Sequence, residues 1–592
     1  MSRRKSMSCP QAVSRRAFLH TSTAAAGLLV SGPSWLRTAA VASVSVAAGE
    51  SESQTGGPMQ VCPKSGPPAR KLAVMRLEEL TSHSWDMRLT LTCLQGIVNR
   101  KQPRLYLIQD RYDELWLEWL KQRGDIDEAE WLDVGQVFGR FLPEVKSMFV
   151  TDPALPGSVN VATMLAAVHG GLVATPLTAA QYDLPMGALP DSWKTGMDLR
   201  TFNWKKNVEA YRWAFGELNE SLSRQAIAVL DPAATGLRDY LVEFKIPVLW
   251  LSGPQDSRSA AASFDEEKAF AREILMKWPT DIPVFGWPDN GQWEERGIGE
   301  WQGVKLFSEC GKFEVCSGYD GYSPTVSNLS IHSGTTATLR QAPPAAVKLE
   351  RGKVYVAFTR SDGDGLNFLR HYYRKLFDDP QHGAVPVGWQ VGPTAADTMP
   401  DILDYYYKHA RPGDCFMNAL SGVGYIHEDI FAANFAPEQQ QEILREFVRL
   451  SGVYRAKIDA TIMATFAEMR PQRLEQIAAI PGIKAIVANY GRTHATTHEN
   501  LISSAAGKPV FRSVNHGPGD LTFTPYGREE AQRFMIGEIR KWTPAGRPAF
   551  LHVFLANWLS QIGMAEKIAK EAGPDYAFVR PDQLLSLYEQ SK

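Results

Sequence analysis

Two aspartates that follow a predicted strand are the first candidates for chemistry. Asp362 and Asp364 lie in a glycine-punctuated turn after residues 353–359, where two valines, a tyrosine and a phenylalanine predict a buried strand. In α/β folds, sites form at the carboxyl ends of strands. Closely spaced carboxylates can act as acid and base, or they can hold one cation together with Asn367. A turn that only caps a helix needs a single Asp, so we favour a functional role.

Acids, amides and aromatic residues also follow the other predicted strands of the second half of the chain. The candidate substrate-binding residues are Gln390, Gly422, Gly424, Tyr425, Asn489, Tyr490, His516, Asn557 and Trp558. Glu428 and Glu468 are candidate second carboxylates, although the segment from His427 to Asp429 also reads as the solvated start of a helix. Because amides bind hydroxyl groups and aromatic faces stack on sugar rings, this mixture favours a polyhydroxylated substrate.

A regular alternation of strands and helices must position these residues. The predicted strands of the second half span 354–359, 385–391, 415–420, 458–465, 483–489, 510–514, 549–556 and 576–580. Amphipathic helices are predicted at 366–378, 399–409, 438–450, 470–480, 527–541 and 561–571. Residues 350–592 therefore predict a (β/α) barrel-like domain, with an open doubly wound sheet as the alternative.

The first half shows the same alternation with shorter elements. Residues 71–345 predict N-terminal α/β parallel-sheet structure, as one domain or as two that divide near residue 150. Two prolines within residues 341–346 mark the boundary before the barrel-like domain. The expected fold class is thus α/β throughout.

The N-terminus predicts export. Arg15 and Arg16 precede Phe18 and Leu19, and an apolar stretch at 24–30 follows, which is typical of a twin-arginine signal peptide over residues 1–47. Residues 48–70, rich in Gly, Ser, Gln and Pro, predict a flexible leader. We therefore expect a periplasmic or extracellular protein.

Charge and cysteine content narrow the function classes. The net charge is −2, and removal of the signal, which holds six basic and no acidic residues, leaves −8. This balance argues against a nucleic-acid partner, and no later run approaches the ~18 apolar residues of a membrane span. Among the six cysteines, Cys310 and Cys316 are close enough in sequence to pair in an exported protein, and the spacing gives no zinc motif.

Three short motifs carry a resemblance to a known family. Residues 94–100 read LQGIVNR, residues 361–364 read SDGD and residues 421–425 read SGVGY. From about residue 70 to its end, the chain resembles the GxGYxYP family of putative glycoside hydrolases. It departs from the family pattern at His427 and Glu428, where the family has Tyr-Pro, and at Gly365, where an Asn is common.

The residues and the resemblance together predict an exported glycoside hydrolase acting on a poly- or oligosaccharide. One carboxyl group would protonate the leaving oxygen, and the other would attack the anomeric carbon as a nucleophile or activate water as a base. Asp362 or Asp364 would fill one role, and Glu468 or Glu428 the other. No cofactor is required for this chemistry. One alternative is a metal-dependent carbohydrate hydrolase or deacetylase that holds a divalent cation through Asp362, Asp364 and Asn367 or a histidine such as His516. The other is a non-catalytic glycan-binding protein.

Overall fold

The computed structural model describes residues 60–592 except 78–83, 182–195, 253–259, 289–297, 319–323, 364, 467–469, 490–496, 515–527 and 556–561. Val61–Lys592 form one compact unit. The predicted signal peptide and most of the predicted leader lie outside the described residues. Within the described ranges, no helix is both long and apolar enough to cross a membrane.

The described part of residues 71–334 holds three small parallel sheets. The first has the order β2-β1-β3 and the second β5-β4-β6. Their strands are β1 (Lys71–Arg76), β2 (Leu105–Ile108), β3 (Glu128–Trp131), β4 (Ser147–Val150), β5 (Gly171–Ala174) and β6 (Met197–Asp198). Their helices are α1 (Ser84–Asn99), α2 (Arg111–Arg123), α3 (Val134–Phe141), α4 (Ser158–His169), α5 (Pro176–Gln181) and α6 (Asn207–Glu217).

The third parallel sheet, with the order β10-β9-β7-β8, lies next in sequence to the C-terminal part. Its strands are β7 (Ile227–Val229), β8 (Val248–Leu249), β9 (Pro283–Gly286) and β10 (Phe313–Cys316). Its helices are α7 (Arg238–Glu243), α8 (Phe264–Lys277), α9 (Glu300–Glu309) and α10 (Leu329–His332). The prediction of N-terminal parallel-sheet structure is confirmed.

The C-terminal part is built on a nine-stranded sheet, counted over the residues that the structure describes. All eight predicted strands are present as β11 (Val354–Arg360), β12 (Val387–Val391), β13 (Asp414–Asn418), β14 (Ile462–Phe466), β15 (Ala485–Asn489), β17 (Lys508–Arg512), β18 (Ala549–Leu555) and β19 (Tyr576–Phe578). A further short strand, β16 (Ile502–Ala505), pairs antiparallel with β17, and every other pairing is parallel.

This sheet is strongly curled. Its order is β16-β17-β15-β14-β13-β12-β11-β18, with β19 paired to the first half of β11. Beyond the end of β17, Ser513 bridges His552 of β18 in parallel fashion, and the Val514 amide donates to the His552 carbonyl at 2.9 Å. Strands β13 and β14 are paired through one residue pair, Asn418 and Met463. The result is a half-barrel-like parallel sheet, and full barrel closure stays a prediction.

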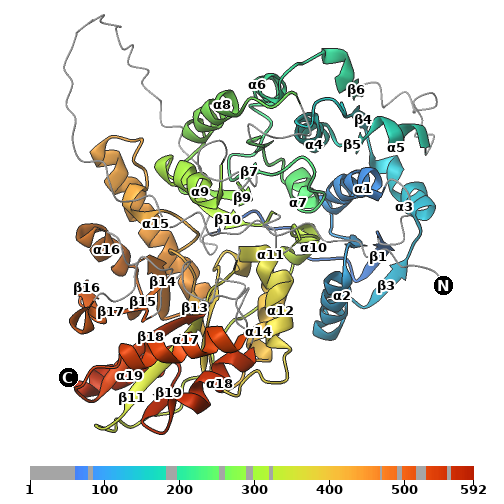
Figure 1. Cartoon of the computed structure of the whole chain (residues 1–592). Helices are drawn as coiled ribbons and strands as arrows, with labels where there is room; N and C mark the ends of the chain where they lie inside the picture. The colour runs from blue at the N-terminus through green and yellow to red at the C-terminus, as the bar shows by residue number, and fades with distance from the viewer. Residues whose placement is uncertain are drawn as a thin grey trace, which may run out of the picture. The chain divides into compact units, whose positions relative to one another are not determined.

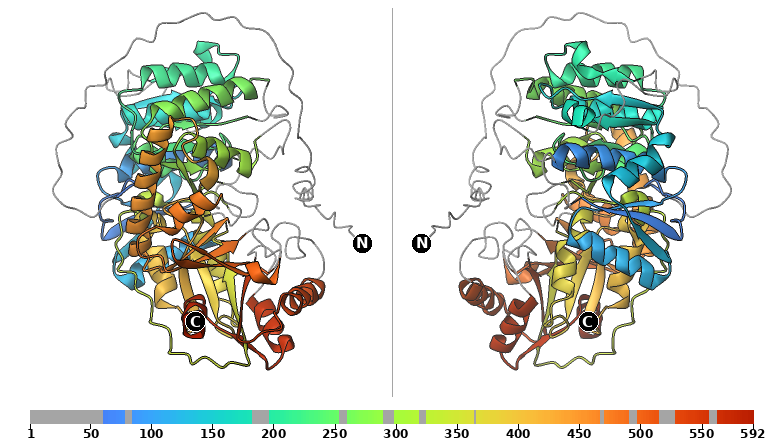
Figure 2. Two further views of the ribbon diagram at one scale, coloured as in Figure 1. Left: turned by 90° about the vertical axis from the view of Figure 1, so that its left-hand side faces the viewer. Right: turned by 90° about the vertical axis from the view of Figure 1, so that its right-hand side faces the viewer.

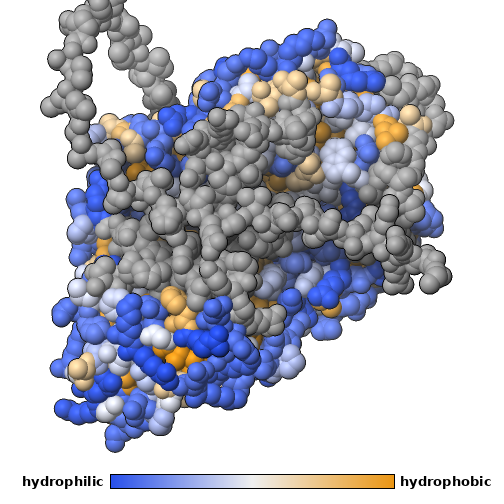
Figure 3. Space-filling view, in the orientation of Figure 1, coloured by the Kyte–Doolittle hydropathy of each residue, from blue (hydrophilic) through white to orange (hydrophobic). Residues whose placement is uncertain are grey.

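Helices follow most of these strands, as predicted. They are α11 (Gly365–Arg370), α12 (Tyr372–Phe377), α13 (Ala395–Thr398), α14 (Pro400–Lys408), α15 (Pro437–Lys457), α16 (Pro471–Ala478), α17 (Arg528–Lys541), α18 (Ile562–Ala572) and α19 (Pro581–Ser591). Figures 1 and 2 show α17, α18 and α19 at the end of this unit farthest from the three N-terminal sheets. In Figure 3 the described surface over these helices is largely hydrophilic, with smaller hydrophobic areas between them.

Both faces of the sheet are buried, which explains the near-continuous apolar strands. On one face of β11, Tyr355 and Ala357 belong to an apolar cluster that includes residues of α19. On the other face, Val354, Val356 and Phe358 belong to the larger apolar cluster of the chain. Because both faces are filled, the open functional positions are at the carboxyl ends of the strands.

The first N-terminal sheet is joined to the C-terminal part through α2, which lies beside α12 and α14 in Figure 1. The indole N–H groups of Trp116 and Trp119 donate to the carbonyl oxygens of Arg370 and Asp401 at 2.7 and 2.8 Å. The guanidinium of Arg370, 1 % exposed, donates to Asp113 at 2.9 Å and also pairs with Asp110. Buried polar groups of this kind need such partners, so they fix the position of α2.

The cysteines of the described residues are all buried and form no disulfide with one another, so Cys310 and Cys316 do not pair. Burial raises the pKa of the Cys310 thiol, so this group behaves as a small apolar side chain.

Candidate functional site

The turn after β11 places the Asp362 side chain at the carboxyl end of the sheet. All seven residues of β11 are buried, and Asp362, two residues beyond its end, is half-buried. The Gly363 amide, at φ +66°, donates to the Ser361 hydroxyl at 3.1 Å and closes the turn. Asp364, the second predicted aspartate, lies outside the described residues.

The Asp362 carboxyl group is poised to hold a proton near neutral pH. Burial raises its pKa from 3.8 to about 7, the carboxylate of Glu300 adds to the rise, and a bond from its own backbone N–H opposes it. A carboxyl group with such a pKa can serve as a general acid at physiological pH.

Gly365, one of the positions at which the chain departs from the family pattern, lies in close contact with the third N-terminal sheet. Its φ is +67°, and a Cβ at this position would lie 2.7 Å from the carbonyl oxygen of Cys316, which ends β10. The next turn of the chain is held to the same segment, since the Asn367 amide donates to the Gly318 carbonyl at 2.9 Å and its oxygen accepts from the Cys316 thiol at 3.4 Å. Asn367 is fully buried.

The loop after β13 makes a second close approach to the rest of the chain. Gly422 has a φ of +148°, and a Cβ there would lie 2.4 Å from the Ser451 hydroxyl of α15. Gly424 lies against the Phe313 ring of β10. Tyr425 then pairs with Glu314: its amide donates to the Glu314 carbonyl at 3.0 Å, and the Glu314 amide donates back at 2.9 Å. Both loops are therefore fixed by β10.

Glu428 lies on the short 3₁₀ turn Glu428–Ile430, and its side chain is only 2 % exposed. The Thr465 hydroxyl donates to Glu428 Oε1 at 2.7 Å. Burial raises the pKa of Glu428 from 4.5 to about 7, while the hydrogen bonds from Ser421 and Thr465 hold it lower than burial alone would. A short helical turn does start here, but the expectation that it is solvated is wrong for His427 and Glu428, which are buried.

An aromatic cluster covers this turn. The Trp301 ring lies 3.8 Å from the His427 ring, and it meets Phe466 edge-to-face at 5.6 Å. Tyr425 lies within 6.1 Å of His427 and 6.0 Å of Phe466, measured between ring centroids. These rings come from α9, β14 and the loop after β13, and His427, which precedes Glu428, is one of them.

Two residues of this site were missed in the sequence. Trp301 and Glu300 open α9 in the N-terminal part, and the hydroxyl of Tyr425 donates to Glu300 Oε1 at 3.2 Å. The contact spans 125 positions of the chain, so no local periodicity indicates it. The adjacent acid and aromatic side chains at 300–301 are the only sequence signal that could have singled them out.

Gln390 is a buried polar side chain with no hydrogen-bond partner among the residues that the structure describes. It is fully buried on β12, between β11 and β13, and among the described residues neither its amide oxygen nor its amide nitrogen is hydrogen-bonded. Because buried amides nearly always have partners, a bound water or a substrate hydroxyl is the natural complement. This agrees with the substrate-binding role predicted for Gln390, which stays a prediction.

Several predicted site residues are not tested by the structure. Glu468, Tyr490, His516, Asn557, Trp558 and the side chain of Asn489 lie outside the described residues. Across the ranges that are described, no three His, Cys, Asp or Glu side chains are grouped as metal ligands.

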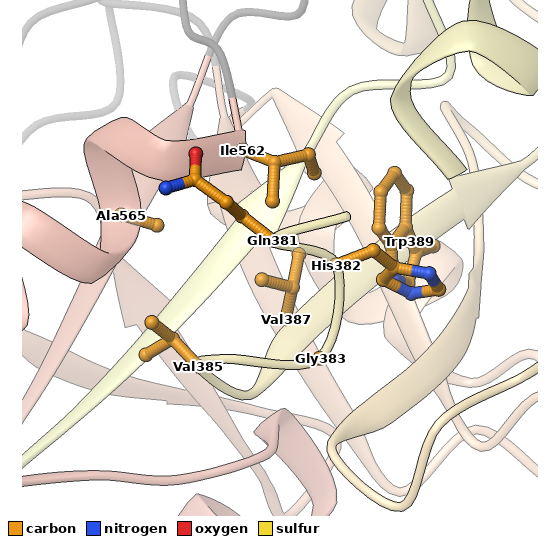
Figure 4. Close-up of a pocket in the computed structure, with 8 residues that line it drawn as sticks. All are labelled: Gln381, His382, Gly383, Val385, Val387, Trp389, Ile562 and Ala565. Carbon is orange, nitrogen blue, oxygen red and sulfur yellow. The ribbon is translucent and has the colours of Figure 1, made fainter. Parts of the chain in front are cut away.

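A small pocket lies at the opposite, amino-terminal end of β12 (Figure 4). Val385, Val387 and Trp389 line it together with Ile562 and Ala565 of α18, and His382 binds the Asp414 carboxylate at 2.9 Å beside it. Its lining is mostly apolar and includes none of the candidate carboxyl groups, so it is separate from the candidate site.

The described geometry suits acid catalysis on a sugar. Two carboxyl groups have pKa values near 7, Asp362 in the turn after β11 and Glu428 in the loop after β13. The charge of Glu300 acts on the first, and Glu300 also binds Tyr425 of the loop that carries the second. Protonated and ionised carboxyl groups can coexist there at neutral pH, which is what glycosidic bond cleavage requires.

Comparison with known proteins places the whole described unit in one group. Residues 352–589 match the GxGYxYP putative glycoside hydrolase C-terminal domain. Residues 71–141, 145–222 and 224–334 match the first, second and third GxGYxYP domains. No curated protein matches the chain.

Two solved structures are similar to different extents. A putative hydrolase from Bacteroides thetaiotaomicron is 20 % identical, with a TM-score of 0.71 over 90 % of this chain and 96 % of that chain, and shares the fold. A putative polysaccharide deacetylase from Mycobacterium smegmatis is 13 % identical, with a TM-score of 0.28 over 43 % of this chain and 96 % of that chain, too low to support an argument.

Proposed function

This chain belongs to the GxGYxYP family, and from that premise we propose that it is a glycoside hydrolase acting on a poly- or oligosaccharide. The observation that carries the proposal is the pair of carboxyl groups, Asp362 in the turn after β11 and Glu428 in the loop after β13, whose pKa values are both raised to about 7. The curled sheet would then act as a (β/α) barrel does, with substrate at the carboxyl ends of its strands.

In the proposed reaction Asp362 is the general acid, because its carboxyl group is the more exposed of the two. Its proton passes to the glycosidic oxygen as the bond from that oxygen to the anomeric carbon breaks. A water molecule adds its oxygen to the anomeric carbon, and its proton passes to a second carboxylate, for which Glu428 is the described candidate. Asp364 and Glu468 stay candidates for the same roles.

We also propose export through the twin-arginine signal, with the mature protein in the periplasm or outside the cell. Support comes from the arginine pair before Phe18 and Leu19 and from the apolar stretch that follows.

The experiment is hydrolysis of a panel of aryl glycosides and polysaccharides by the wild type and by Asp362→Asn and Glu428→Gln. Loss of a positioned acid or base is expected to lower kcat about 10²-fold or more. Asp281→Asn and Glu243→Gln are matched controls, because they replace buried carboxyl groups with pKa values raised to about 8 and about 9 elsewhere in the fold. Their activity should stay near that of the wild type.

Three outcomes would contradict the proposal. A folded Asp362→Asn variant with full activity on a verified substrate removes the general-acid assignment. Activity that chelators abolish and divalent ions restore indicates the metal-dependent hydrolase or deacetylase. Oligosaccharide binding without turnover, unchanged in both carboxyl variants, indicates a glycan-binding protein.

A further inference from the structure

Helix α9 of the third N-terminal sheet is clamped onto the loop that carries Glu428. The Ser308 hydroxyl accepts a bond from the His427 amide at 2.9 Å, and the Ser308 carbonyl accepts from the Ala432 amide at 2.7 Å. The Asn434 amide donates to the Glu309 carbonyl at 3.0 Å. These bonds join the C-terminal end of α9 to both sides of the Glu428 turn, so the helix is a fixed part of the candidate site.

The first turn of α9 points its two functional side chains toward this site. Val304, Leu306 and Phe307, farther along the helix, are buried, whereas Glu300 and Trp301 in its first turn are half-buried. Trp301 packs on His427 and Phe466, and the residue is partly exposed. Half-exposed indole surface beside carboxyl groups is suited to the apolar face of a sugar ring.

Glu300 links the two catalytic loops electrostatically. Its Oε1 accepts the hydrogen bond from Tyr425 at 3.2 Å, in the loop after β13. Its negative charge also acts on Asp362, in the turn after β11, where it favours the protonated carboxyl group. Glu300 of the N-terminal part thus binds Tyr425 in the loop after β13 and favours the protonated form of Asp362 in the turn after β11.

We propose that α9 is a wall of the active site, in which Trp301 is the surface for a sugar ring and Glu300 is a positioning residue for Tyr425 and Asp362. The active site is therefore shared between the third N-terminal domain and the C-terminal domain. This inference rests on the proposed function for its substrate class, and it names which part of the chain recognises that substrate.

The first test measures binding of cellotetraose, xylotetraose, mannotetraose and maltotetraose by calorimetry, in the Glu428→Gln background so that no turnover occurs. Trp301→Ala should weaken binding of the tetraose that binds best about tenfold or more, because a stacked ring is lost. Trp301→Phe should recover part of the affinity. Trp213→Ala, a half-buried tryptophan of α6, is the matched control and should bind as its parent does.

The second test does not need a sugar. A diazo reagent esterifies protonated carboxyl groups: the acid proton passes to the diazo carbon, nitrogen leaves and the ester bond forms. Peptide mass spectrometry then follows labelling of Asp362 against pH. Glu300→Gln should lower the midpoint by about one pH unit, since a like charge is removed. Glu309→Gln, on the same helix, should leave the midpoint unchanged.

The outcomes separate this inference from the proposed function. If no tetraose binds and no glycoside is cleaved, the proposed function fails, and the labelling midpoint still reports whether Glu300 acts on Asp362. If a tetraose binds equally well to Trp301→Ala and its parent, the wall is refuted while the function stands. An unchanged midpoint in folded Glu300→Gln refutes the positioning role.

Discussion

Replacement of Glu428 by Gln should make the protein more stable at alkaline pH while it lowers activity. Glu428 has a pKa of about 7 in the folded protein against 4.5 for an unperturbed glutamate, because burial disfavours its charged form. The folded state therefore binds this proton more tightly than the unfolded state does. Its stabilising contribution is complete below about pH 4.5, is lost as the pH rises toward 7, and is absent above that. Glutamine is neutral at every pH and escapes this loss.

The size of the effect follows from the same two pKa values. The difference between about 7 and 4.5 corresponds to about 3 kcal/mol of unfolding free energy. A Gln at this position can keep the bond from Thr465, because its side-chain oxygen accepts as the carboxylate does. Any packing cost of the amide is independent of pH. The free energy of unfolding of the variant, relative to wild type, should thus rise by about 3 kcal/mol between acid and alkaline pH.

The assay is urea denaturation followed by circular dichroism and tryptophan fluorescence, at about pH 4.5 and about pH 8.5, on either side of the transition. The wild type and Glu428→Gln are compared with Glu442→Gln, which replaces an exposed glutamate of α15. The reasoning is refuted if the difference in unfolding free energy between Glu428→Gln and the wild type changes by less than about 0.5 kcal/mol between these two pH values. Such a result would show that Glu428 has an ordinary pKa and is a poor candidate for acid–base work.

Three further predictions follow from described contacts. Arg370→Met should lower the free energy of unfolding by about 3–5 kcal/mol, because two aspartates lose a buried partner; a loss below about 1 kcal/mol in urea titrations would contradict this. Gly365→Asn, the residue common in the family, should destabilise by about 1–3 kcal/mol because its Cβ would meet a backbone oxygen, whereas Gly352→Asn has open space and should not. Thr465→Val removes a hydrogen bond that lowers the pKa of Glu428, so this pKa should rise further and the limb of the pH–rate profile that reports Glu428 should move to higher pH. A limb that stays in place would show that the Thr465 hydrogen bond does not influence the pKa of Glu428.

The strands of the C-terminal sheet could be predicted from the sequence because each is a short apolar run that ends in turn residues. β11 shows this clearly, since all its residues are buried and the turn with Gly363 and Gly365 follows at once. β3 was missed because its sequence, EAEW, has no buried residue, and a strand that faces solvent carries no apolar pattern. β16 was missed because Ile502–Ala505 is half exposed and pairs across a tight turn at Ala506 and Gly507.

The candidate site could be predicted only in part. Asp362 and Tyr425 were identified because they directly follow strands, where parallel sheets bring side chains together. The environment of Glu428 could not be predicted, because Trp301, which packs on the preceding residue His427, is 127 positions earlier in the chain than Glu428. Contacts over such distances depend on the packing of whole domains and leave no trace in local hydrophobic periodicity.

The anchoring of α2 has a consequence for how this protein can be divided. Trp116 and Trp119 occupy the surface of the C-terminal helices and use the backbone carbonyls of Arg370 and Asp401 as their acceptors. A fragment that starts near residue 350 would lack the two tryptophans, so the surface that they cover would be exposed to water. Arg370 would also lose its partners Asp110 and Asp113. The smallest piece worth expressing or transplanting therefore begins before β1, and swapping the C-terminal part between relatives requires a matching α2.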